Sequence, residues 1–216
     1  PKLRPVNSGA LFTKDALRLL SRSKTGMAVR KDLQPLNLGI GAPSGSERIG
    51  LTMTGCYKAG GAVNNEDGIN GFNATKRQAM HDSFNRVWPS AVAALNFFYG
   101  PKCLVLYSFT LPSGEMVIEI IESEEGARMG CIWGSLLFGI AMKSTYETLN
   151  AEFPEFISVA HTDDNPVGIP APSDGNWDRQ LRRLQQRLRR YDELANPLGI
   201  VRNLDKSIIM LILPPG

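Results

Sequence analysis

Three aspartates are the residues of this chain best suited to chemistry. Asp67 ends a weak strand pattern, and Asp163 and Asp164 lie in the sequence Thr-Asp-Asp-Asn-Pro, which is typical of a turn. Side chains of neighbouring residues on a regular strand face opposite ways, so Asp163 and Asp164 converge only if the chain turns there. If Asp67 lies on the next strand, the three carboxylates crowd together and resist ionisation. Divalent cations relieve such crowding, and oxygen-only ligands favour magnesium.

Each of these aspartates, taken alone, is equally typical of an ordinary turn. The helices and strands that position the aspartates therefore decide between a magnesium site and ordinary turns. We expect helices at 13–22, 74–87, 89–99, 133–149 and 178–194, hairpins at 102–121 and 156–169, and a buried strand at 207–213. Residues 60–70 form a weak strand, and 38–47 are a loop by composition. Helices that alternate with strands and hairpins predict an α+β fold, a sheet with helices on one face.

Composition narrows the class of protein. The 216 residues are 43% hydrophobic, which suits one domain or two small ones and excludes a disordered polymer. The net charge of +3 is too small to indicate a nucleic-acid binder by itself. Cys56, Cys103 and Cys131 are odd in number and form no C-x-x-C pair, so we expect neither a disulfide scaffold nor zinc but an intracellular, reducing location.

No segment of the sequence favours a membrane partner or a signal peptide. The longest uncharged apolar run, 130–142, is too short to span a membrane and predicts a buried helix. Because the chain opens at Pro1 without Met, we expect it to be a piece of a longer protein.

The helix over 178–194 has the clearest amphipathic pattern. Its apolar residues form one stripe, and its arginines are expected on a solvated outer face. These arginines are Arg179, Arg182, Arg183, Arg187, Arg189 and Arg190. Trp88, Trp133 and Trp177 are expected to be packing residues and not platforms for bases.

Five short blocks resemble, in order, the reverse transcriptases of non-LTR retrotransposons and related elements. The block Asp67-Gly-Ile-Asn-Gly-Phe-Asn73 resembles their D-x-x-N-A-F-N, and His161-Thr-Asp-Asp164 resembles their Y-x-D-D. The other three blocks are Lys2-Leu-Arg-Pro-Val6, Glu125-Gly-Ala-Arg-Met-Gly130 followed by Ser135-Leu-Leu-Phe138, and Leu198-Gly-Ile-Val-Arg-Asn203-Leu-Asp-Lys206-Ser207. The joint occurrence of the five is specific, although each is short.

The resemblance implies the fingers and palm of a right-hand polymerase, with an antiparallel palm sheet backed by helices. Residues 1–60 would be a fingers segment, 61–216 the palm with fingers elements inserted at about 74–121, and a thumb would follow Gly216. Asp67 and Asp163 would bind two Mg²⁺ ions, with Mn²⁺ as a substitute. Asp164 would assist, and the Gly68 carbonyl would be an extra ligand.

The resemblance also implies contacts to the nucleotide. Phe72 would exclude a 2′-hydroxyl and so select deoxynucleotides, and Lys206 would act on the departing pyrophosphate as a proton donor or counter-charge. Lys2 and Arg4 would reach the triphosphate, and Arg128 and Gly130 would lie near the nucleotide or template. The alternatives stay open: a core Phe, solvated charges and a flexible glycine loop.

The implied activity is that of an RNA-directed DNA polymerase, which extends a DNA or RNA primer on an RNA template with deoxynucleoside triphosphates. The location would be inside the cell, with the nucleus as one option, and the oligomeric state stays open. Met129 stands where the family has Gln, His161 where it has an aromatic residue, and Trp133 where Pro is common. Two alternatives therefore remain: an RNA-dependent RNA polymerase palm, and an inactive polymerase-like module that binds nucleic acid or protein.

Overall fold

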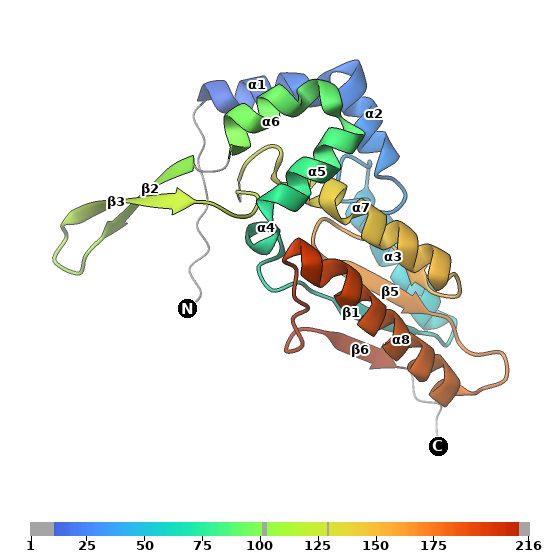
Figure 1. The fold of residues 1–216 in the computed structure, drawn as a ribbon. Helices are drawn as coiled ribbons and strands as arrows, with labels where there is room; N and C mark the ends of the chain where they lie inside the picture. Colours follow the sequence, from blue (N-terminus) through green and yellow to red (C-terminus); the bar gives the residue numbers. More distant parts are fainter. Residues whose placement is uncertain (1–10, 101–102, 129, 212–216) are drawn as a thin grey trace.

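The computed structural model describes residues 11–100, 103–128 and 130–211. A four-stranded antiparallel sheet forms the centre of the larger part of the molecule. The strand order is β4 (Ile157–Ser158), β5 (Asn165–Ile169), β1 (Ala62–Glu66) and β6 (Ile208–Leu211). The register pairs Glu66 with Asn165 and Asn65 with Ile208. The ends of β1 and β5 that carry the aspartates therefore lie side by side (Figure 1).

Helices cover both faces of this sheet. On one face Ala62 packs with residues of α7 (Gly134–Glu152) and α8 (Trp177–Ala195). On the other face Val63 packs against Ile49 and Met53 of α3 (Gly45–Lys58). Successive residues of a strand point to opposite faces, so α3 lies opposite α7 and α8. The expectation of helices on one face was wrong because α3 was not foreseen.

A second core joins the N-terminal helices to the first half of α7. Its elements are α1 (Leu11–Arg22), α2 (Lys24–Asp32), α5 (Arg77–Val87), the 3₁₀ turn η1 (Pro89–Ala91) and α6 (Val92–Tyr99). Trp88 and Trp133 are buried there and contact the ring of Phe84, which confirms them as packing residues. The remaining short elements are α4 (Gly71–Ala74) and η2 (Asn196–Leu198).

The helices α2 and α3 were missing from the sequence prediction, which gave 1–50 one helix. Gly26 lies inside α2, and α3 contains Gly50 and Gly55, and glycine disfavours helix by about 1 kcal/mol per residue. Tertiary packing outweighs this, because α3 buries Ile49 and Met53 against the sheet. The loop expected at 38–47 ends where α3 begins.

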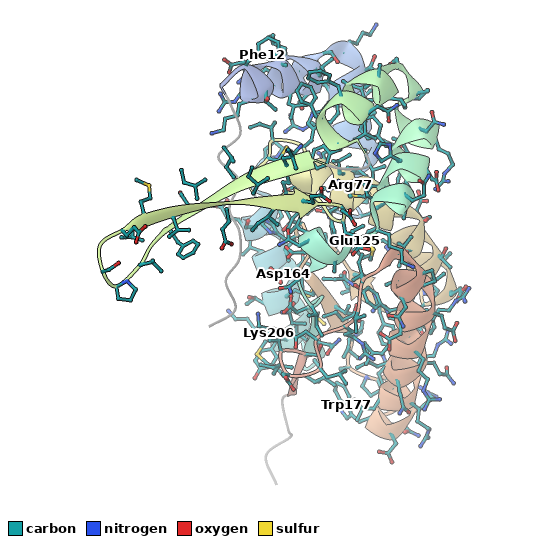
Figure 2. All side chains as sticks on the ribbon, turned by 60° about the vertical axis from the view of Figure 1, so that its left-hand side comes forward. Phe12, Arg77, Glu125, Asp164, Trp177 and Lys206 are labelled. Atoms are coloured by element: carbon teal, nitrogen blue, oxygen red, sulfur yellow. The ribbon has the colours of Figure 1, made fainter. Side chains whose placement is uncertain are left out.

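A hairpin of β2 (Cys103–Thr110) and β3 (Met116–Ser123) projects away from the body of the molecule (Figures 1 and 2). Leu104, Leu106, Ile118 and Ile120 on it are each more than 60% exposed. The predicted hairpin is confirmed, and none of its described side chains belongs to either core. In the part of the chain that the structure describes, no helix is long and apolar enough to span a membrane.

Candidate functional site

The aspartates of the sequence prediction line one open pocket of about 570 Å³ at the end of the central sheet. Asn64 and Glu66 of β1 face the helices behind the sheet, whereas Asn65 and Asp67 line this pocket on the other face. The strand thus separates two neighbouring carboxylates, Glu66 and Asp67, onto opposite faces. The residues that line the pocket are Asn65, Asp67, Gly68, Asn70, Gly71, Phe72, Asn73, Asp163, Asp164, Asp205, Lys206 and Ile208.

The segment between β4 and β5 makes the turn that the Asp-Asp pair requires. His161 and Asp164 exchange backbone hydrogen bonds of 2.7 and 3.1 Å, so Thr162 and Asp163 form a two-residue tip. Thr162 has a φ of +55°, a conformation that β-branched residues rarely adopt. The surrounding contacts must therefore hold the turn in place.

The side chain of Asn37 stabilises the turn at Thr162. Its side chain is buried, donates a 3.0 Å hydrogen bond to the Thr162 carbonyl and accepts one of 3.0 Å from the Thr162 amide. It also accepts a 3.1 Å bond from the Gly39 amide. The loop after α2 therefore sets the position of the Asp163 tip from a distant part of the chain.

The charges of Asp67 and Asp163 act on the carboxyl of Asp164 in the pocket. A Cβ atom added to Gly71 would lie 3.5 Å from the Asp163 Cβ, so the turn sits against the start of α4, just beyond Asp67. Burial raises the pKa of the Asp164 carboxyl above its ordinary value, and the charges of Asp163 and Asp67 raise this pKa further. The pocket is consequently a place where negative charge is crowded.

The segment 196–207 closes the pocket beneath Asp67. The Asn203 amide donates a 2.7 Å bond to the Asp67 carbonyl, and the Asn203 side chain donates a 3.3 Å bond to Asp67 Oδ2. Lys206 Nζ lies 3.4 Å from the same oxygen. The structure thus places Lys206 beside Asp67 (Figure 2 labels Asp164 and Lys206).

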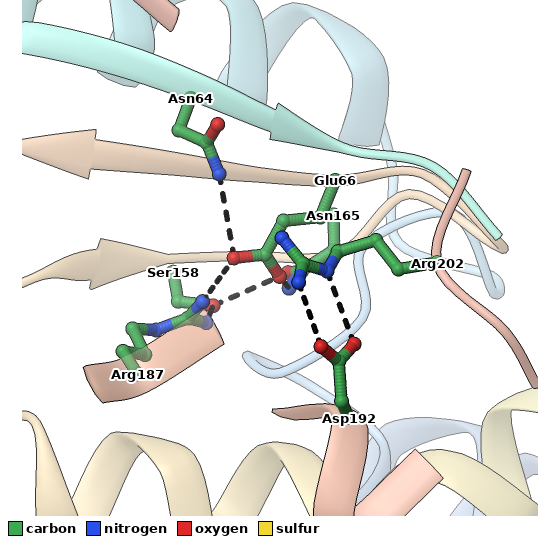
Figure 3. A network of polar contacts seen from close by, with 7 residues as sticks. All are labelled: Asn64, Glu66, Ser158, Asn165, Arg187, Asp192 and Arg202. Atoms are coloured by element: carbon green, nitrogen blue, oxygen red, sulfur yellow. Dashed lines mark hydrogen bonds and ion pairs between the residues drawn. The ribbon is translucent and has the colours of Figure 1, made fainter. Parts of the chain in front are cut away.

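A buried polar network lies behind the same strand end (Figure 3). Arg187 of α8 and Glu66 form an ion pair in which both side chains are only 1% exposed. Asn165 Nδ2 donates a 2.7 Å bond to Glu66 Oε2, and Arg187 also donates to Ser158 at 3.0 Å. Burial raises the pKa of Glu66, and Arg187 and then Asn165 act against that rise. The network ties β1, β4, β5 and α8 together.

The placement of Arg187 corrects the sequence prediction of a solvated arginine face. Arg187 points to the sheet because it lies on the buried stripe with Leu184 and Tyr191. Arg183 and Arg190 are half-buried and pair with Glu155 and Glu152. The exposed members of the set are Arg179, Arg182 and Arg189.

Phe72 lies between the aspartate pocket and a smaller cavity of about 210 Å³. Its ring is 5.2 Å from that of Phe138, so it is packed from behind and half-buried. Arg128 and Gly130 line the smaller cavity, but the Arg128 guanidinium donates to the Phe98 carbonyl and stacks 4.5 Å over Tyr99. Arg128 is therefore held by α6, and its predicted contact to a nucleotide would require it to move.

Some residues of the sequence prediction lie outside the described residues, namely Lys2, Arg4 and Met129. Conversely, several polar residues in or beside the pocket were absent from the set of candidates: Asn37, Asn65, Asn70, Asn73, Asn203 and Asp205. Asn203 and Asp205 lie inside the fifth block, which was the available signal. Nothing near Asn37 in the sequence indicates its partner, because Thr162 is 125 residues away.

Magnesium prefers oxygen ligands such as these carboxylates, but the described residues do not form a complete metal site. Within 11–100, 103–128 and 130–211, no group of three or more His, Cys, Asp or Glu side chains is arranged to hold a metal ion by itself. Mg²⁺, however, is usually bound through one or two carboxylates together with waters and substrate phosphates. Asp67 and Asp163 line the same pocket and are two carboxylates of the kind that such partial coordination uses.

The antiparallel sheet, its acidic end and the helices behind it form the α+β palm of a right-hand polymerase. No family model matches the chain. It is 25% identical over 211 residues to the "Retrotransposable element SLACS 132 kDa protein" of Trypanosoma brucei gambiense, a match that covers 97% of this chain and 16% of that protein.

Solved telomerase structures share the fold. Apo telomerase from Candida tropicalis gives a TM-score of 0.59 at 10% identity over 92% of this chain and 37% of its own. The form truncated from its C-terminal domain gives 0.56 at 11% identity, over 94% and 44%. Telomerase from Candida albicans with a fragment of telomeric RNA gives 0.55 at 10% identity, over 92% and 34%. The resemblance to reverse transcriptases is confirmed at low identity, and the chain spans less than half of each of these relatives.

Proposed function

We propose that this chain is the fingers and palm portion of an RNA-directed DNA polymerase that adds deoxynucleotides to a primer 3′-hydroxyl. The observation that carries the proposal is the joint placement of Asp67, Asp163 and Lys206 in one pocket. The relatives are a retrotransposable-element protein and telomerases, one of them solved with RNA, which agrees with nucleic-acid partners. A template RNA, a DNA or RNA primer and deoxynucleoside triphosphates are the proposed substrates.

In this proposal Asp67 and Asp163 hold two Mg²⁺ ions, with Asp164 assisting and the Gly68 carbonyl as a further oxygen. When bound, the ions supply positive charge that activates the primer hydroxyl and stabilises the departing pyrophosphate. The protein itself contributes position and charge, which is most of what phosphoryl transfer requires. Lys206, 57% exposed and beside Asp67, is free to turn toward the pyrophosphate.

Phe72 supports the choice of deoxynucleotides. Its ring is backed by Phe138 and borders the aspartate pocket, so it cannot retreat without displacing the core of α7. A ring held in this way excludes the 2′-hydroxyl that distinguishes a ribonucleotide.

The test is primer extension on an RNA template by the full-length protein that contains this chain, with Mg²⁺, deoxynucleotides and, separately, ribonucleotides. Asp67→Asn and Asp163→Asn are each expected to abolish extension, whereas Asp178→Asn, an exposed carboxylate on α8, is the matched control. Equal use of ribonucleotides would favour an RNA polymerase instead. Extension that survives both site variants would refute the proposed chemistry.

A further inference from the structure

Arg77, a buried arginine at the start of α5, has no part in the chemistry proposed above. It is only 5% exposed. The chain is extended at Thr75 and Lys76, with ψ angles of 123° and 125°, and α5 then begins with Arg77 inside the molecule. Burial of a charged group is unfavourable unless its donors are paired, so the partners of this guanidinium show what it holds.

The Arg77 guanidinium holds both ends of the hairpin β2–β3. Its Nη1 donates a 3.1 Å hydrogen bond to the Gly100 carbonyl and one of 2.6 Å to the Ser123 carbonyl. Gly100 follows α6 ahead of the hairpin, and Ser123 is the last residue of β3. Nη2 also donates a 3.1 Å bond to Ser123 Oγ. One side chain therefore joins the segments that enter and leave the hairpin.

The same guanidinium holds the loop 124–128, which follows the hairpin. Arg77 Nη2 donates a 3.1 Å bond to the Glu125 carbonyl and one of 3.3 Å to the Gly126 carbonyl (Figure 2 labels Arg77 and Glu125). Buried carbonyls need hydrogen-bond partners. The planar fork of arginine reaches several acceptors at once, whereas the ammonium group of lysine is a single point of charge. Lysine at this position would therefore hold only part of the loop.

The loop 124–128 lies directly on the backbone of Phe72. The Ala127 amide donates a 2.7 Å hydrogen bond to the Phe72 carbonyl, and the Gly126 amide donates one of 3.0 Å to the Thr75 carbonyl. Gly126 has a φ of +70°, and a Cβ atom there would collide with the main chain of α4, so this close approach requires glycine. The position of Phe72 thus depends on the position of the loop.

The carboxylates of the site are positioned by other parts of the chain. Asp67 accepts a hydrogen bond from Asn203, and the turn that carries Asp163 is held by Asn37. Under the proposed function, Phe72 and the loop lie where the sugar of a nucleotide would fit. Loss of Arg77 should therefore alter the fit of the nucleotide and leave the carboxylates in place.

We propose that Arg77 is a positioning residue, which holds the loop 124–128 against Phe72 and so determines how closely the sugar of the incoming nucleotide fits. Its effect on the nucleotide rests on the proposed function, whereas its hold on the loop does not. The two parts are tested by separate measurements.

The first test is steady-state primer extension by the full-length protein that contains this chain, at varied concentrations of deoxynucleotide and ribonucleotide. A displacement of about 1 Å can cost up to about 100-fold in rate, so Arg77→Lys is expected to lower kcat/KM for the deoxynucleotide about 10- to 100-fold. Most of this loss should be in KM, with kcat reduced less than about threefold, because the carboxylates stay in place. The preference for deoxynucleotides over ribonucleotides should fall as well, and Arg77→Met should show larger effects than Arg77→Lys.

Two controls separate positioning from charge and from stability. Arg86→Met removes the same charge as Arg77→Met from an exposed position of the same helix. Leu95→Ala opens a cavity at a fully buried position of α6 and destabilises the N-terminal core without removing a bond to the loop. Both controls should leave KM and the deoxynucleotide preference unchanged. A rise of KM in Leu95→Ala equal to that in Arg77→Lys would overturn the proposal.

The second test does not need polymerase activity. Hydrogen exchange is followed by mass spectrometry in the peptide that contains 124–128. In Arg77→Lys the amides of Gly126 and Ala127 should exchange at least about tenfold faster, while those of β1 keep their rates. Arg86→Met should exchange as the wild type does.

The two measurements distinguish this proposal from the polymerase itself. Faster exchange of the loop in Arg77→Lys, in a full-length protein that never extends a primer, would support the hold of Arg77 on the loop and refute the polymerase. Extension by the wild type, with unaltered loop exchange and unaltered KM in Arg77→Lys, would overturn the role of Arg77 and leave the polymerase standing.

Discussion

Breaking the ion pair between Glu66 and Arg187 should be among the most destabilising single changes in this protein. Both side chains are 1% exposed, and removal of one partner from a buried pair costs about 3–5 kcal/mol because the other charge stays buried. For a chain of this size, Arg187→Met should lower the melting temperature by about 6–20 °C. Glu66→Met/Arg187→Met should recover much of this loss, since an apolar pair of similar volume is often tolerated.

The assays are urea unfolding for the free energy and thermal unfolding for the melting temperature, followed by tryptophan fluorescence and circular dichroism, since Trp88 and Trp133 are buried in the N-terminal core. Arg190→Met is the matched control, because Arg190 is 36% exposed and pairs with Glu152 and Glu193 at the surface. It should cost no more than about 1 kcal/mol. If Arg187→Met were no more destabilising than Arg190→Met, the reasoning about the buried pair would be wrong.

Three further changes test other parts of the structure. Asn37→Ala should destabilise the protein by about 1–3 kcal/mol, because it leaves the buried amide and carbonyl of Thr162 without their hydrogen-bond partner, and it should also reduce primer extension. The control Asn96→Ala, at an exposed position of α6, should change neither the free energy of unfolding in urea nor primer extension. Phe72→Val should raise incorporation of ribonucleotides relative to deoxynucleotides at least tenfold in competitive extension assays, and an unchanged ratio would show that Phe72 is only a packing residue. Replacement of 104–122 by a short Gly-Ser linker should change the free energy of unfolding by less than about 1 kcal/mol, because exposed apolar side chains remove little apolar surface from water on folding. A loss of several kcal/mol would show that the hairpin is part of the core.

Local sequence signals were sufficient where an element depends on its own residues. The hairpin β2–β3 and helix α8 follow from strand and helix periodicity with clear turn or cap signals. The blocks around Asp67, Asp163 and Lys206 also indicated which residues meet in one pocket. In contrast, α3 was missed because its glycines resemble a loop, and the helix is stabilised by packing of Ile49 and Met53 against the sheet.

The sequence by itself determined the hairpin β2–β3, the helix α8 and the residue types that the proposed two-metal site needs. Only the tertiary structure decided that Arg187 turns inward to Glu66 and that Asn37 holds the turn at Thr162. Only the tertiary structure also gathered Arg18, Arg22 and Arg30 around one cavity. The physical reason is that burial and pairing depend on contacts between residues far apart in the chain, and periodicity reports which face of an element is apolar but not what will cover it.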